Sequence, residues 1–205
     1  MRLSRYILET TPSMENAADV IVDKKKPLII RSLKSSKSFS SFIMGLNNIF
    51  MDINVVFVPT ERPESERVRK YIAGGVTNIT NGSIAIFPVN IEIENIKPEI
   101  FFKDLKKILT HELMHRYQAI SSKGNIRGKK HTGITDYLSS DPEIEAYAND
   151  SYMDIKKGDT QKLEDILSWL NIPTRKKFLK KVYFYAKNDK KALELIKNVL
   201  NKGGL

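Results

Sequence analysis

The sequence predicts an α+β fold, in which a small mixed sheet is combined with several helices. Residues 53–58 and 83–87 are short runs rich in β-branched and aromatic side chains, each followed by a proline, and such runs are typical of strands. A longer segment opens at Pro98 and repeats apolar side chains at helical spacing. The 205 residues and 41% hydrophobic content are enough for one core.

The first half of the chain contributes one helix and the two strands. Its N-terminal stretch has no regular pattern, and we expect it to be irregular. Residues 38–50 carry apolar side chains at helical spacing and predict an amphipathic helix. The turn-forming pair Asn81 and Gly82 comes just before the strand at 83–87. Because proline cannot donate to a sheet, Pro88 predicts that this strand lies at an edge.

The second half is expected to be helical. A helix with a broad apolar face covers residues 98–120, and a glycine-rich, basic loop follows at 121–131. Ser140 begins the next helix, which runs to about residue 157, and Glu143 stands at its capping-box position.

The C-terminal part, residues 158–205, predicts two or three more helices, with breaks at Pro173 and near Asn188. We expect the whole chain to form one domain, with its core at about 38–157.

Composition excludes several classes of protein. The chain has no cysteine, so a metal would be held by His, Asp or Glu. Residues 1–22 lack the apolar core of a signal peptide, and no segment is apolar enough to span a membrane, so we expect a cytoplasmic protein without membrane contact. The net charge of +10 is spread over many segments without a nucleic-acid-binding motif. Binding to nucleic acid is therefore an expectation that rests on charge alone.

The central helix contains the pattern HExxH, from His111 to His115. Two histidines four residues apart face the same side of a helix and can bind one zinc ion. Glu112 lies beside them and can act as general base, taking a proton from the attacking water.

Catalytic zinc needs a third protein ligand. The longer metzincin pattern is absent, because Gln118 and Ser121 stand where it requires glycine and histidine. Glu145 is the first candidate, because it lies on the next helix and Glu143 is assigned to capping. The other candidates are His131, Asp136, Glu143 and Asp150.

With these residues the sequence resembles gluzincin-like metallopeptidases, whose third ligand is a glutamate on a helix downstream of HExxH. Glu145-Ala146 followed by Ala148 is similar to the pattern of ImmA/IrrE-type peptidases, and residues 137–148 resemble small phage-encoded relatives. The resemblance covers roughly residues 84–150. It implies a zincin-like fold and a strand, here at 83–87, whose edge faces an extended substrate. If the chain is phage-encoded, it would act in the host cell or in the virion.

A hydrolase of this kind also needs a donor for the negative oxygen that develops on the substrate carbonyl. The candidates are His131, Tyr137 and Tyr147. Asp150 could instead orient a ligand histidine by accepting a hydrogen bond from its second nitrogen.

The sequence thus predicts a zinc-dependent metallopeptidase that hydrolyses protein or peptide substrates, with Zn²⁺ on His111, His115 and Glu145. Glu112 is the predicted general base, and Tyr147 and His131 are further catalytic candidates. The alternative is a structural or binding protein, phage-derived or associated with nucleic acid, whose zinc site is not catalytic. A closed fourth coordination position would favour that alternative.

Overall fold

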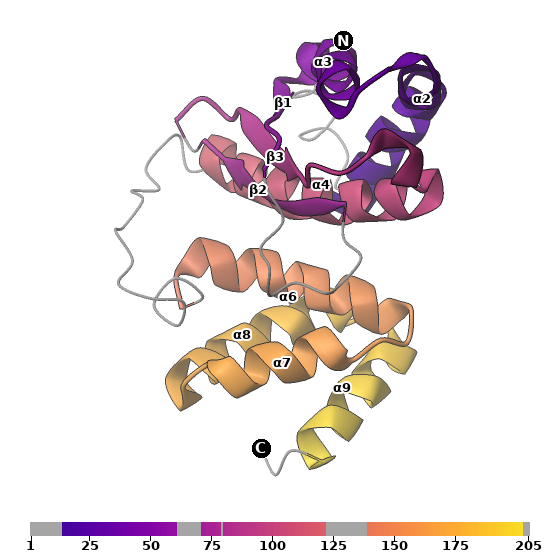
Figure 1. The fold of residues 1–205 in the computed structure, drawn as a ribbon. Coiled ribbons are helices and arrows are strands. Elements are labelled where there is room, and N and C mark those ends of the chain that lie inside the picture. The colour runs from indigo at the N-terminus through magenta and orange to yellow at the C-terminus, as the bar shows by residue number, and fades with distance from the viewer. Residues whose placement is uncertain (1–13, 61–70, 79, 122–138, 203–205) are drawn as a thin grey trace. The chain divides into compact units, whose positions relative to one another are not determined.

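The computed structural model describes residues 14–60, 71–78, 80–121 and 139–202 (Figure 1). Contacts within the chain cluster into two compact units, Met1–Arg127 and Gly128–Leu205. Each unit is described by itself. The expected organisation as one domain stays a prediction.

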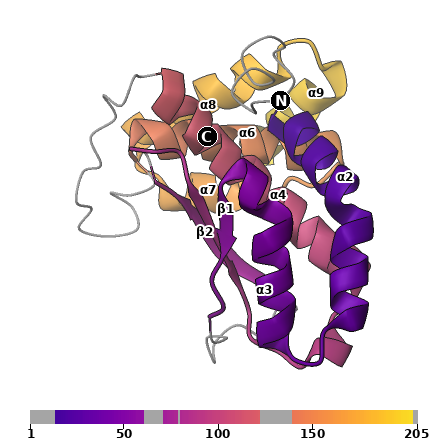
Figure 2. The same cartoon turned by 90° about the horizontal axis from the view of Figure 1, so that it is seen from above.

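The described part of the first unit consists of three long helices and a sheet, whose arrangement can be followed in Figures 1 and 2. Helix α2 packs on α3 and α4, and α4 also packs along strand β2. In chain order its elements are α2 (Met14–Ser35), α3 (Phe39–Phe50), the 3₁₀ turn η1 (Met51–Ile53), β1 (Val55–Phe57), β2 (Ile72–Thr77), β3 (Ile84–Pro88), the 3₁₀ turn η2 (Ile93–Asn95) and α4 (Pro98–Ser121). The predicted helices at 38–50 and 98–120 and both predicted strands are confirmed.

The sheet has the order β1-β3-β2, with β3 parallel to β1 and antiparallel to β2. It is therefore the small mixed sheet that was expected, but β3 lies in its centre, and the prediction that this strand lies at an edge is wrong. Pro88 lacks an N–H, yet its carbonyl accepts a hydrogen bond from Thr60 N at 2.9 Å. A proline at the end of a strand can thus take part in pairing as an acceptor.

Strand β2 was not expected from the sequence. Its residues, IAGGVT, include two glycines, which weaken a strand signal because they contribute no side chain. Pairing with β3 supplies the backbone hydrogen bonds instead.

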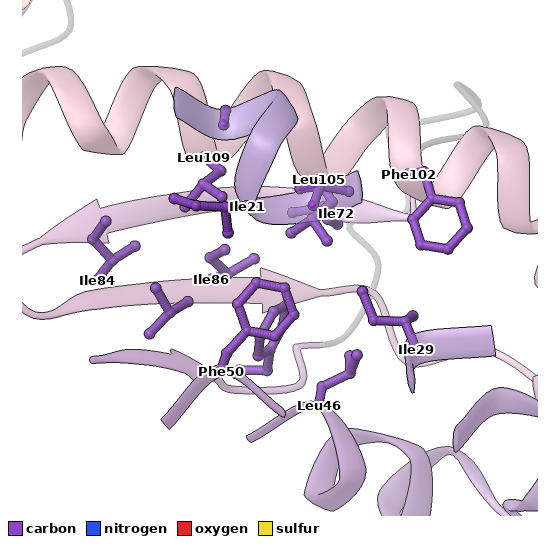
Figure 3. Packing of buried hydrophobic residues seen from close by; sticks show 14 of the residues in the cluster. Ile21, Ile29, Leu46, Phe50, Ile72, Ile84, Ile86, Phe102, Leu105 and Leu109 are labelled. Carbon is purple, nitrogen blue, oxygen red and sulfur yellow. The ribbon is translucent and has the colours of Figure 1, made fainter. Parts of the chain in front are cut away.

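The core of this unit lies between the sheet and the helices (Figure 3). Leu105 and Leu109 of α4 are fully buried, as are Ile84 and Ile86 of β3 and Phe50 at the end of α3. Burial of such side chains stabilises the fold by about 1.5–3 kcal/mol each. The apolar face of α4 thus packs against the sheet, and this packing fixes the directions in which the other side chains of the helix point.

Helix α2 corrects the expectation of an irregular N-terminal stretch. It contains Pro27, which lacks the N–H of a helical hydrogen bond and obscures the helical pattern in the sequence. Val22 and Ile29 on this helix are fully buried in the core, so packing holds the segment helical around the proline.

The second unit is helical in its described part. It comprises α6 (Asp141–Lys156), α7 (Gln161–Trp169), α8 (Ile172–Ala186) and α9 (Lys190–Lys202), and α6 packs on each of the other three. Ile144 of α6, Leu163 of α7 and Phe178 of α8 belong to its core. The predicted C-terminal helices are confirmed, and Pro173 lies in the first turn of α8.

Over the described residues the fold is therefore a mostly helical α+β structure, with seven α-helices and a mixed sheet of three strands. None of these helices has both the length and the apolar character needed to cross a membrane.

Candidate metal centre

The HExxH residues lie on the C-terminal half of α4. Nε2 of His111 is 3.1 Å from Nε2 of His115, so the two rings converge on one point beside the helix. Two nitrogens bound to one tetrahedral zinc at about 2 Å lie about 3.3 Å apart. The spacing of the two imidazoles therefore suits a shared ion.

Gln118 orients one of these rings. Its Oε1 is 3.0 Å from Nδ1 of His115, one turn further along α4. This contact suits a ring proton on Nδ1 of His115, donated to the amide oxygen. That tautomer leaves the lone pair of Nε2 available to a metal ion. In the sequence, Gln118 stands out only as a departure from the longer metzincin pattern.

Glu112 points to a different side of α4 from the histidines and meets strand β2. Its carboxylate is buried, and Thr77 Oγ1 lies 2.7 Å from its Oε2. The packing of α4 on the sheet thus places the two histidines on one side of the helix and the hydrogen-bonded carboxylate of Glu112 on the adjacent side.

Arg116 anchors the end of α4 that carries the motif. Its buried guanidinium donates hydrogen bonds to the carbonyl oxygens of Ile53 at 3.0 Å and Asn54 at 3.1 Å, and to that of Gly82. Burial lowers the pKa of Arg116 to about 10, which leaves it charged at neutral pH. One side chain therefore joins α4 to the loops that precede β1 and β3.

We expect Arg116→Met to lower the free energy of unfolding by about 3 kcal/mol, because it leaves buried carbonyl oxygens without their donor. The measurement is urea unfolding of the metal-free protein. Lys103→Met is the control, because Lys103 is exposed on the same helix and should change stability by less than about 0.5 kcal/mol. Equal effects of the two substitutions would contradict the anchoring role of Arg116.

Helix α6 carries the two glutamates that the sequence offers as third ligand. Glu145 accepts hydrogen bonds from Lys181 Nζ at 3.1 Å and Tyr185 OH at 3.2 Å, so its carboxylate faces α8. Glu143 is buried and lies about 200° around the helix from Glu145. Ser140 stands at the N-cap, but its side chain makes no capping hydrogen bond. The bond that the expected capping box requires from Ser140 is therefore absent.

The other predicted residues are placed as follows. Lys162 lies over the ring of Tyr147, with Nζ 5.4 Å from the centroid, and it also donates to Asp150 Oδ2 at 2.6 Å. A catalytic role for Tyr147, a role for Asp150 in orienting a ligand histidine and a ligand role for Glu145 stay predictions. His131, Asp136 and Tyr137 lie outside the described residues.

His111 and His115 offer two imidazole nitrogens to a metal ion, and α6 carries Glu143 and Glu145 as the candidate carboxylates. Two imidazoles and a carboxylate are the donor set of many catalytic zinc sites, but other divalent metals accept it as well. Comparisons with protein-family models, curated proteins and solved structures give no match.

Proposed function

We propose that the chain is a zinc-dependent metallopeptidase of the gluzincin kind, in which His111, His115 and Glu143 hold the ion and Glu112 is the general base. The observation that carries this proposal is the convergence of the two Nε2 atoms at 3.1 Å, one residue away from a buried, hydrogen-bonded carboxylate.

Glu143 is preferred to Glu145 on the contacts of α6. The carboxylate of Glu145 is engaged by Lys181 and Tyr185 of α8, so binding a metal would require it to give up these partners. Glu143 lies on the other side of α6 and is only 7% exposed. A ligand role for Glu143 would leave the contacts of Glu145 with Lys181 and Tyr185 in place.

When bound, zinc would supply a Lewis acid that polarises the scissile carbonyl and acidifies the attacking water. Glu112 accepts a proton from this water as its oxygen bonds to the carbonyl carbon. As the carbon–nitrogen bond breaks, Glu112 returns the proton to the leaving nitrogen. Each turnover thus consumes one water and leaves Glu112 ionised again.

Strand β2 supports an extended substrate better than β3 does. Strand β3 is paired on both sides, whereas β2 is an outer strand of the described sheet and lies against Glu112. An outer strand can add main-chain hydrogen bonds to an extended peptide. We therefore propose that a peptide substrate binds along the edge of β2.

Metal analysis tests the proposed centre. The purified protein is expected to bind about one zinc per chain. His111→Ala and His115→Ala should each abolish stoichiometric binding, while His131→Ala, which changes the third histidine of the chain, should keep it. Elemental analysis after dialysis gives the ratio, and stoichiometric zinc in a His111→Ala/His115→Ala double variant would contradict the site.

A further inference from the structure

The carboxylate of Glu112 is held by a residue on another element. Thr77, the last residue of β2, places its Oγ1 2.7 Å from Glu112 Oε2 and 2.9 Å from the main-chain oxygen of Glu112. Both side chains are buried. A hydroxyl between the carboxylate and the backbone of one residue restricts the side-chain torsions of that residue.

A glycine on the same strand makes this approach possible. A Cβ atom added at Gly75 would lie 2.8 Å from Glu112 Cγ, 2.9 Å from Ile108 Cγ2 and 3.0 Å from Glu112 Oε1. Contacts this short would force the glutamate or the strand to move. At the neighbouring Gly74 an added Cβ would meet nothing within 4 Å. The close contact is thus specific to Gly75, and it faces Glu112.

We propose that Thr77 is a positioning residue for Glu112, and that Gly75 provides the space in which the carboxylate is held. This inference rests on the proposed function, because it assigns a catalytic purpose to the contact. A glutamate has three side-chain torsions, and fixing them costs conformational entropy. A general base must lie within hydrogen-bond reach of the proton that it takes. The Thr77 hydroxyl fixes the base before substrate binds, through its hydrogen bond to Glu112 Oε2.

The contact itself can be tested without metal or activity. In a double-mutant cycle, Thr77→Val, Glu112→Met and the double variant are unfolded in urea as metal-free proteins. Valine matches the shape of threonine but lacks the hydroxyl, and methionine has nearly the shape of glutamate but lacks the carboxylate. Thr77→Val is expected to change the unfolding equilibrium about tenfold when residue 112 is glutamate and clearly less when it is methionine. Additive effects would show that the hydroxyl does not hold the charged carboxylate, and would overturn the proposal.

Its catalytic purpose is tested on the zinc-loaded protein with a peptide that the wild type cleaves. Thr77→Val should lower kcat about tenfold or more with KM changed less than about twofold, since it affects the base and not substrate binding. Thr77→Ser, which keeps the hydroxyl, should restore most of kcat. Unchanged kcat in Thr77→Val, despite a coupled cycle, would reduce Thr77 to a structural role and overturn the proposal.

The two glycines supply a matched pair on the same strand. In the metal-free protein, Gly75→Ala is expected to shift the unfolding equilibrium at least as strongly as Thr77→Val, whereas Gly74→Ala should leave it within about twofold of the wild type. Equal unfolding equilibria for the two variants would contradict the role of Gly75. A wild type that binds zinc but cleaves no peptide would overturn the proposed function and the catalytic purpose of Thr77. The cycle would still decide whether the contact exists, so the two failures are distinguishable.

Discussion

Glu112→Gln is expected to abolish hydrolysis while leaving the fold and zinc binding intact. Glutamine has nearly the shape of glutamate, and its amide oxygen can still accept the hydrogen bond from Thr77. It cannot take a proton from water at neutral pH, so general-base assistance is lost. Such assistance contributes about 10²- to 10⁴-fold to the rate, and we expect kcat to fall by that amount.

The measurement compares wild type and Glu112→Gln, both loaded with one zinc per chain, on a broad peptide library. A library is needed because the structure does not name a substrate. Zinc content and thermal unfolding of both proteins serve as controls for the site and the fold. Equal cleavage by the two proteins would show that the activity belongs to a contaminant or that another group acts as the base.

Glu143→Ala is expected to weaken zinc binding far more than Glu145→Ala does. Glu143 is the proposed third ligand, so its removal leaves two imidazoles to hold the ion. Removal of Glu145 frees Lys181 and Tyr185, whose contacts with it are partly exposed. Its expected cost is less than about 1 kcal/mol in folding, with zinc affinity nearly unchanged.

Competition with a chromophoric chelator measures zinc affinity in both variants, and thermal unfolding of the metal-free proteins measures the folding cost. The two positions are matched controls for each other, because they lie two residues apart on one helix. The reverse ranking would return the third ligand to Glu145, as the sequence alone suggests. No change in either variant would place the third ligand elsewhere in the chain.

Parts of the fold could be predicted because local patterns determine them. The apolar period of residues 98–120 defines α4, and the same period fixes that His111 and His115 share one side of it. Ser38 was placed at the start of a helix, and in the structure its side chain accepts a hydrogen bond from Ser41 N. These features depend on residues within a few positions of each other.

Other features could not be predicted because they depend on segments far apart in the chain. Strand β2 exists through its pairing with β3, and α2 remains helical around Pro27 through burial in the core. The hydrogen bonds of Arg116 could not be predicted for the same reason, since the residues that accept them lie 63, 62 and 34 positions before it in the chain.

The sequence by itself determined the pair of imidazoles in the candidate site, because the helical spacing of HExxH brings His111 and His115 together whatever surrounds the helix. Only the tertiary structure decided how the remaining carboxylates are used. Because β2 packs on α4, Thr77 and Gly75 contact Glu112. Because α6 packs on α8, Glu145 accepts hydrogen bonds from Lys181 and Tyr185. The physical reason is that helical periodicity is a local property, whereas the hydrogen-bond partner of a buried carboxylate is supplied by whichever distant segment packs against it.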